Sequence, residues 1–140
     1  MAGLIYVFDT TTLSELLNRT SPVQGRIRSA HDDGNRLILC QRAYYEVLRG
    51  LLKVNATRKL EVFRNRLVPL LEWVQLTDID WEQAARFWAG VTARGRQFSD
   101  MDLLVAAVAA RLGGVIVSSD DDFDALPVPR EDWRSAPPAE

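Results

Sequence analysis

Short runs of apolar residues alternate along the chain with longer segments in which apolar residues recur every three or four positions. The runs lie at residues 4–8, 37–40, 73–77 and 115–117, and a further strand at a sheet edge is expected within residues 128–133. Runs that are apolar without alternation are typical of strands buried on both faces of a sheet. The pattern therefore predicts four to five short strands.

The segments between these runs have helical spacing. Threonines at residues 10–12 offer N-cap chemistry for a short helix with Leu13, Leu16 and Leu17 facing inward, and Ser21-Pro22 is typical of a second helix start that would end near residue 34. Three longer helices are expected at residues 41–52, 57–71 and 80–94. Their predicted inward faces are Tyr44, Val47, Leu48, Leu51 and Leu52; then Leu60, Phe63, Leu67, Leu70 and Leu71; then Trp81, Ala84, Ala85, Trp88 and Val91.

The last predicted helix is almost wholly apolar. Ser99 opens it, residues 103–112 form its buried body, and Gly113-Gly114 ends it. We expect the tryptophans and tyrosines of the chain to belong to the core. Alternating strands and helices predict an α/β fold, a three-layer α/β/α sandwich around a parallel sheet of four to five strands. One domain over residues 1–134 and a disordered Pro/Ala-rich tail at residues 135–140 are expected.

Composition sets outer limits on function. Apolar residues make up 47% and charged residues 26% of the 140 residues, as in ordinary globular proteins. No apolar run approaches the roughly 20 residues of a membrane span, and residues 1–8 are too short for a secretory signal. The single cysteine, Cys40, cannot form an internal disulfide, so we expect a reducing cytoplasm. No Cys/His pairs have zinc spacing.

Charge permits a nucleic-acid partner without requiring one. The net charge is −2, but neutralising five acidic residues with a cation would change it to +3. Fifteen of the 17 basic residues are arginine, whose planar guanidinium binds phosphate with two hydrogen bonds. A GC-rich genome explains the excess of arginine equally well.

Four acidic residues are candidates for a site, and a parallel sheet would bring two of them, Asp9 and Asp120, to the same edge. Asp9 follows the first strand, Glu46 is in the helix after the second, Asp102 is in the first turn of the apolar helix, and Asp120 follows the run at 115–117. Ligands of open α/β sheets bind outside the carboxyl ends of the strands. Carboxylates crowded there repel one another unless a divalent cation joins them, and oxygen ligands suit Mg²⁺ or Mn²⁺.

Each acid also has a purely structural interpretation. Asp9 could cap the helix that follows it, and Asp102 could form a capping box with Ser99. Asp100 could favour the helix dipole, and the acids at residues 120–124 could form a solvated turn. Helical spacing places Glu46 opposite the apolar stripe, which is solvent or a cleft.

Order and spacing together are more specific than any single segment. Residues 4–133 resemble the PIN-domain family, and in particular the VapC-type toxins of bacterial toxin–antitoxin pairs. The segments that carry the resemblance are YVFDT at residues 6–10 with LSELL at 13–17, EVLRG at 46–50, SDMDLLVAA at 99–107, and VIVSSD at 115–120 with DF at 122–123.

The resemblance implies a metal-dependent endoribonuclease with Mg²⁺ or Mn²⁺ as cofactor. By position it implies metal ligands at Asp9, Asp102 and Asp120, a fourth acid at Glu46, a supporting hydroxyl at Ser118, and an auxiliary acid at Asp100, with the choice between Asp100 and Asp102 open. Thr11 stands where the family commonly has asparagine. Such chemistry needs no histidine, and the single one, His31, is expected at the surface.

The resemblance further implies an RNA substrate, a homodimer, and a cognate antitoxin that fills the acidic groove. Arg42, Arg49, Arg94 and Arg96 are candidates to hold the RNA backbone, although surface ion pairs explain them equally well. The main alternative is a PIN-like module that binds RNA or a partner without cutting, although it predicts the loss of one or more acids. Other α/β phosphate-binding enzymes lack their marker residues here; for example, no G-x-G-x-x-G follows the first strand.

Overall fold

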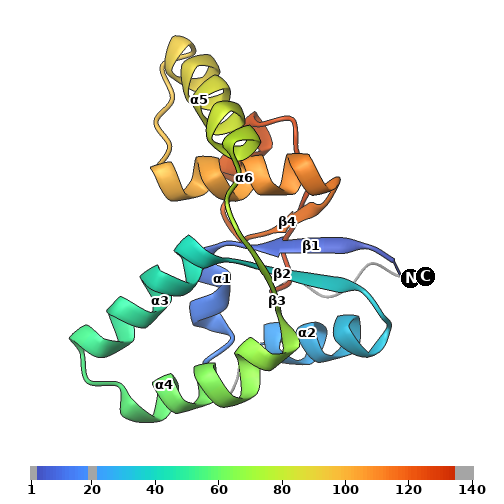
Figure 1. Cartoon of the computed structure of the whole chain (residues 1–140), viewed down its shortest axis with the longest axis vertical. Coiled ribbons are helices and arrows are strands. Elements are labelled where there is room, and N and C mark those ends of the chain that lie inside the picture. Colours follow the sequence, from blue (N-terminus) through green and yellow to red (C-terminus); the bar gives the residue numbers. More distant parts are fainter. Residues whose placement is uncertain (1–2, 19–21, 135–140) are drawn as a thin grey trace.

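A computed structural model describes residues 3–18 and 22–134, and it contains a five-stranded sheet in the order β3-β2-β1-β4-β5 (Figure 1). Every pairing between neighbouring strands is parallel. The strands are β1 (Ile5–Phe8), β2 (Arg36–Cys40), β3 (Glu72–Val74), β4 (Val115–Val117) and β5 (Arg130–Glu131). The predicted tail at residues 135–140 and the predicted cap at Ser21 lie outside the described residues.

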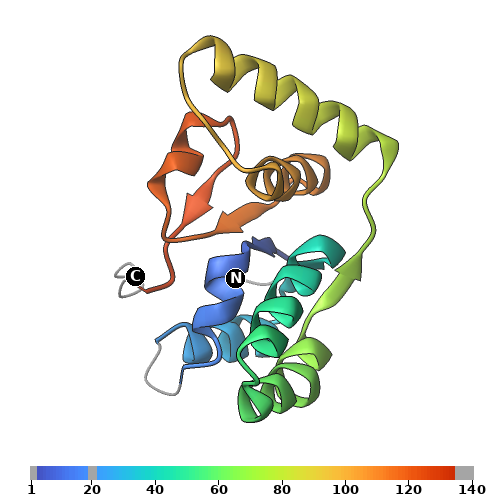
Figure 2. The same cartoon turned by 90° about the vertical axis from the view of Figure 1, so that its left-hand side faces the viewer.

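Helices cover both faces of the sheet (Figures 1 and 2). On one side lie α1 (Thr10–Glu15), α2 (Pro22–Asp32), α3 (Gln41–Lys53) and α4 (Thr57–Val62), and on the other lie α5 (Asp78–Ala93) and α6 (Asp100–Leu112). The three-layer α/β/α prediction is confirmed. Within the described part of the chain, no helix is both long and apolar enough to span a membrane.

The central strands position the carboxyl edge of the sheet. β1 pairs with β2 on one side and with β4 on the other, and Val7, Phe8, Ile38 and Val117 are completely buried. Gly114 lies so close to β1 that a Cβ there would sit 3.0 Å from the Ile5 carbonyl oxygen. Because β1 and β4 are adjacent and parallel, the residues that follow them emerge side by side.

The predicted inward face of α5 is wrong in part. The buried stripe is Asp80, Ala84, Phe87 and Val91, because Asp80 pairs with Arg111 of α6 and turns these residues toward that helix. Trp81 and Trp88 are consequently 51% and 54% exposed. Together with Trp73, which is 44% exposed, they contradict the prediction that the tryptophans belong to the core, whereas Trp133 is buried as expected.

The segment at residues 57–71 is less regular than the predicted single helix. After α4 it continues as the π-helical turn η1 (Phe63–Leu67) and the 3-10 turn η2 (Val68–Leu70), where Pro69 cannot donate a helical hydrogen bond. Phe63 and Leu67 are nonetheless buried as predicted. The strand expected at residues 73–77 begins one residue earlier and ends at Val74, and the one expected within 128–133 is limited to β5.

Candidate metal-binding site

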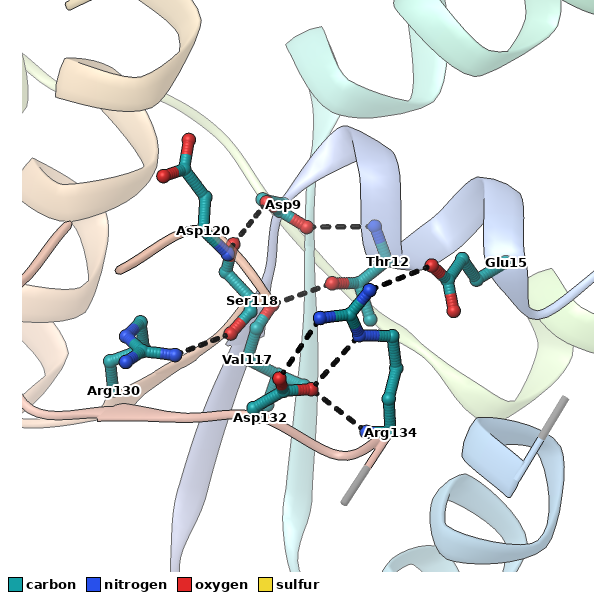
Figure 3. Close-up of polar contacts among 9 residues, drawn as sticks. All are labelled: Asp9, Thr12, Glu15, Val117, Ser118, Asp120, Arg130, Asp132 and Arg134. Atoms are coloured by element: carbon teal, nitrogen blue, oxygen red, sulfur yellow. Dashed lines mark hydrogen bonds and ion pairs between the residues drawn. The ribbon is translucent and has the colours of Figure 1, made fainter. Parts of the chain in front are cut away.

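Asp9 lies directly after β1 and is 5% exposed. Its Oδ1 accepts a hydrogen bond from the backbone N–H of Thr12 at 2.8 Å, so Asp9, rather than the threonines, caps α1. Its Oδ2 accepts a hydrogen bond from the Ser118 hydroxyl at 2.6 Å (Figure 3). The carboxylate is thus held from two sides, and capping does not prevent it from presenting its remaining lone pairs to a cation.

Ser118 joins Asp9 to Asp120. The buried Ser118 hydroxyl donates to Asp9 and accepts the backbone N–H of Asp120 at 3.0 Å (Figure 3). The Asp120 Oδ1 in turn accepts the N–H of Asp122 at 2.9 Å and caps η3 (Asp121–Ala125). Arg130 donates to the Ser118 carbonyl at 3.1 Å. This chain of hydrogen bonds fixes the segment after β4 beside the end of β1.

Asp102 comes from the first turn of α6. Ser99 caps this helix by accepting the backbone N–H of Asp102 at 3.1 Å, which leaves the half-buried carboxylate at the site. Burial raises the pKa of Asp102, hydrogen bonding with Ser99 lowers it, and the negative charges of Asp9, Asp120 and Glu46 raise it further. The net effect is a raised pKa, and all three of the other predicted acids contribute to it through their negative charge.

Glu46 reaches the same edge from α3. Its side chain is 22% exposed, its Oε2 accepts the Thr10 hydroxyl at 3.1 Å, and its Oε1 lies 3.8 Å from the guanidinium of Arg49. Its position opposite the apolar stripe of α3 therefore also places it beside Thr10, at the end of β1.

The remaining predicted residues lie in different surroundings. Asp100 is exposed and lines a hollow of about 350 Å³ together with Arg42, Trp81 and Trp88. Thr11 is exposed, and its neighbours Thr10 and Thr12 make the contacts to the site.

Two of the four predicted RNA-binding arginines contact acids of this edge. Arg49 lies beside Glu46, and Arg96 lies 3.4 Å from Asp122. Arg94 donates to the carbonyl of Gly90 at 3.3 Å and to that of Ala125 at 3.0 Å, which ties the end of α5 to η3. Its guanidinium is therefore engaged in the fold.

Of the three consecutive threonines, the sequence prediction gave an individual role only to Thr11. Thr12 is buried; its N–H binds Asp9 and its hydroxyl donates to the Val117 carbonyl at 3.0 Å, so it holds the ends of β1 and β4 together. The signal for Thr12 was its position three residues after Asp9, which is the spacing of an N-cap and its partner.

The donor set fits a hard divalent cation. Every predicted ligand offers carboxylate oxygen, and the repulsion that raises the pKa of Asp102 is the kind that a cation relieves. In the described part of the chain, one group of three carboxylates has its oxygens within 4.8 Å of one another: the exposed Asp120, Asp121 and Asp122. Asp9 and Asp102 are outside that group, so the structure gathers the predicted ligands at one edge without bringing them into so tight a cluster.

Sequence comparisons connect this arrangement with known proteins. The family model of the PIN domain matches residues 6–129. Ribonuclease VapC11 of Mycobacterium tuberculosis is 33% identical over 101 residues, which are 71% of this chain and 72% of VapC11. VapC ribonuclease Mb1587 of Mycobacterium bovis matches to the same extent.

Solved structures share the fold at lower sequence identity. DNA-bound VapBC from Salmonella typhimurium contains a chain that matches with a TM-score of 0.81 at 20% identity, over 94% of this chain and 99% of that one. A chain of VapBC2 from Rickettsia felis, bound to a DNA fragment from its promoter, matches with a TM-score of 0.77 at 18% identity, over 91% and 98% of the two chains.

Proposed function

Since the chain belongs to the PIN domain family, and within it to the VapC ribonucleases, we propose that it is a metal-dependent endoribonuclease and the toxin of a toxin–antitoxin pair. The observation that carries the proposal is the meeting of Asp9, Asp102, Asp120 and Glu46 at the carboxyl edge of the sheet. The pKa of Asp102 supports this arrangement, because burial raises it and the negative charges of the other three acids raise it further.

Asp9, Asp102 and Asp120 would hold Mg²⁺ or Mn²⁺, and Glu46 would complete the acidic quartet. When bound, such a cation lowers the pKa of a water molecule and neutralises charge on the phosphate during hydrolysis. Asp9 is the most constrained ligand, because Thr12 and Ser118 fix both of its oxygens. Ser118 would keep Asp9 and Asp120 in register, in the way that supporting hydrogen bonds orient metal ligands.

Arginines beside the acids would hold the RNA. Arg49 and Arg96 each lie next to an acid of the edge, where a guanidinium can bind a phosphate oxygen and offset the negative field of the site. Arg42 lines the adjacent hollow with Asp100. Arg94 would not bind RNA, because its guanidinium already donates to the carbonyls of Gly90 and Ala125. Its role is to stabilise the fold.

Two protein partners belong to the proposal. VapC-type relatives occur in structures of VapBC complexes, which supports a cognate antitoxin for this chain. A second copy is supported by the exposed apolar side chains of α3 and α5, namely Tyr45, Leu52, Ile79, Trp81 and Trp88. Exposed apolar groups of this size favour a protein interface. A toxin acting on cellular RNA would work in the cytoplasm.

The test is cleavage of total RNA by the purified chain with Mg²⁺ or Mn²⁺, with and without EDTA. We expect cleavage that EDTA abolishes, and none from the double variant Asp9→Asn/Asp102→Asn. Circular dichroism would confirm that the double variant folds. Cleavage that persists in this folded variant would refute the site, and RNA binding without any cleavage by the unaltered chain would favour the non-catalytic alternative.

A further inference from the structure

Arg130 of β5 holds both ends of the segment that presents Asp120. Its Nη1 donates a hydrogen bond to the Ser118 carbonyl at 3.1 Å (Figure 3), and its Nε and Nη2 donate to the two carboxylate oxygens of Asp124, each at 3.0 Å. The Arg130 side chain is only 17% exposed. Three donors of one planar guanidinium are therefore engaged at once, which a flexible side chain with a point charge could not reproduce.

The contact at Ser118 connects Arg130 with two proposed metal ligands. The Ser118 hydroxyl donates to Asp9 at 2.6 Å and accepts the backbone N–H of Asp120 at 3.0 Å. One torsion separates this hydroxyl from the backbone, so its place follows from where the Ser118 backbone lies. Residues of β5 hold that backbone from both sides, since the Ser118 N–H donates to the Glu131 carbonyl at 3.0 Å and the Ser118 carbonyl accepts from Arg130.

Asp124 fixes the guanidinium in this orientation. The pair has two parallel hydrogen bonds, which restrict the geometry of an arginine and a carboxylate more than a single bond does. Hydrogen bonding with Arg130 also lowers the pKa of Asp124. Asp124 belongs to η3, the turn that Asp120 caps. The Asp120 backbone is thus held between Ser118 on one side and η3 on the other, and Arg130 contacts both.

We propose that Arg130 is a positioning residue of the metal site. Fixed by Asp124, it holds the Ser118 backbone where the hydroxyl meets Asp9 and Asp120 together, and it thereby raises the affinity of the site for a divalent cation. Partners that orient the ligands of a metal typically contribute roughly 10- to 100-fold to the affinity. The inference rests on the proposed function, because it takes Asp9 and Asp120 as ligands.

The sign of the effect separates positioning from simple electrostatics. A guanidinium beside the site repels a cation, so its removal would strengthen metal binding if charge alone mattered, whereas loss of positioning would weaken it. Arg134 is a matched comparison, since it also comes from the C-terminal segment and pairs with two acids. These are Asp132 at 3.2 Å and Glu15 at 4.0 Å, and both lie outside the segment that Arg130 holds.

The experiment measures Mn²⁺ binding to the RNA-free chain, by electron paramagnetic resonance of the unbound ion. Arg130→Met is the test, because methionine keeps an apolar stem and has no hydrogen-bond donor. Arg130→Lys keeps the charge without the planar fork, and Arg134→Met is the matched control. Thermal melting in EDTA would establish that each variant is folded at the assay temperature.

We expect Arg130→Met to bind Mn²⁺ about tenfold more weakly, Arg130→Lys roughly threefold more weakly, and Arg134→Met within about twofold of the unaltered chain. Where Ser118→Ala is already present, adding Arg130→Met should weaken binding by less than about twofold, because both residues act through one hydroxyl. Excess Mn²⁺ should restore RNA cleavage by Arg130→Met to within about threefold, whereas Asp120→Asn should stay inactive.

Unchanged or tighter Mn²⁺ binding by Arg130→Met would overturn the inference, and so would an equal loss in Arg134→Met. Losses that add fully in the Ser118→Ala background would overturn it too, because Arg130 would then not act through Ser118. If Arg130→Met does not fold, Arg130→Lys decides in its place. Failure of the proposed function has a different signature, since the unaltered chain and Asp9→Asn/Asp102→Asn would then bind Mn²⁺ equally.

Discussion

Two aspartates occupy the same position in neighbouring helices and have opposite electrostatic surroundings. Asp80 is the third residue of α5 and Asp102 is the third residue of α6, and each donates its backbone N–H to the hydroxyl of the residue that caps its helix. The pKa of Asp80 is lowered, although burial alone would raise it, because Arg111 and Thr77 hydrogen-bond its carboxylate. The pKa of Asp102 is raised by burial and by three facing acids.

The difference separates an acid with a structural partner from the acid that the proposed function places at the metal site. The Asp80 carboxylate is satisfied completely: the Thr77 N–H closes the capping box at 2.9 Å and Arg111 donates at 2.7 and 3.1 Å. The largest influences on the pKa of Asp102 are burial, which raises it, Ser99, which lowers it, and three acids, which raise it; none of these is a cation. An acid left without a cationic partner among other acids costs stability, and a bound cation would offset that cost.

Replacing each aspartate by asparagine should give the largest contrast in activity. We expect Asp102→Asn to lower the rate of RNA cleavage roughly a thousandfold, because a proposed ligand to the cation is lost. This corresponds to a loss of about 4 kcal/mol of transition-state stabilisation. Asp80→Asn, assayed per mole of folded protein, should cleave within a few-fold of the unaltered chain. Comparable losses in both variants would remove the functional distinction between the two positions.

The free energy of unfolding should change in the reverse order, with the larger loss in Asp80→Asn than in Asp102→Asn. Asp80→Asn removes one partner of a buried ion pair and should lower the free energy of unfolding by about 3 kcal/mol, or roughly 10 °C in Tm. The exposed pair Arg86–Glu82 of the same helix is the control, and Glu82→Gln should cost less than about 0.5 kcal/mol. Urea unfolding measures both, and a similar cost at the two positions would show that burial of Asp80 is energetically unimportant.

The two acids should also respond oppositely to pH. Because the folded-state pKa of Asp80 is lowered, its contribution is present above the ordinary carboxyl pKa and is lost as pH falls through that range toward the folded value. The unaltered chain should therefore lose more stability on acidification than Asp80→Asn does. Urea unfolding from neutral to acid pH tests this, and parallel curves for the two proteins would contradict it.

The smallest expected effect is a gain in stability at Asp102. Its raised folded-state pKa means that ionisation at neutral pH disfavours the folded chain, so Asp102→Asn should stabilise the protein in EDTA by roughly 0.5 kcal/mol. Saturating Mg²⁺ should then raise the Tm of the unaltered chain more than that of the variant, since only a ligand of the folded state stabilises it. A variant that Mg²⁺ stabilises as strongly would exclude Asp102 as a ligand.

Some parts of the candidate site could be predicted from the sequence and others could not. The strand ends at Asp9 and near Asp120 follow from short apolar runs, so their place at one edge of the sheet was predictable. Asp102 and Glu46 were assigned to the site by the family resemblance. The supporting contacts of Thr12 were predictable only in part: its spacing from Asp9 indicates a capping partner, but nothing local indicates that its hydroxyl donates to the Val117 carbonyl. Their roles depend on how β1 and β4 are placed.

The orientation of α5 was not predictable from apolar spacing for a related reason. Its buried stripe begins with Asp80, a residue that hydropathy places in solvent and that is buried only because Arg111, 31 residues later, reaches it. With Asp80 inside, Trp81 and Trp88 turn outward. The spacing of apolar residues in either helix does not indicate an ion pair between residues so far apart in the sequence.

The hydrogen bond between Asp9 and Ser118 joins residues that are 109 positions apart in the chain. During synthesis the first acid of the site is made early, and the strand that completes its surroundings leaves the ribosome far later. At translation rates of 5–20 residues per second, this interval lasts roughly 5 to 20 seconds. Because Ser118 orients Asp9, a metal site built in this order stays incomplete until most of the chain has been made.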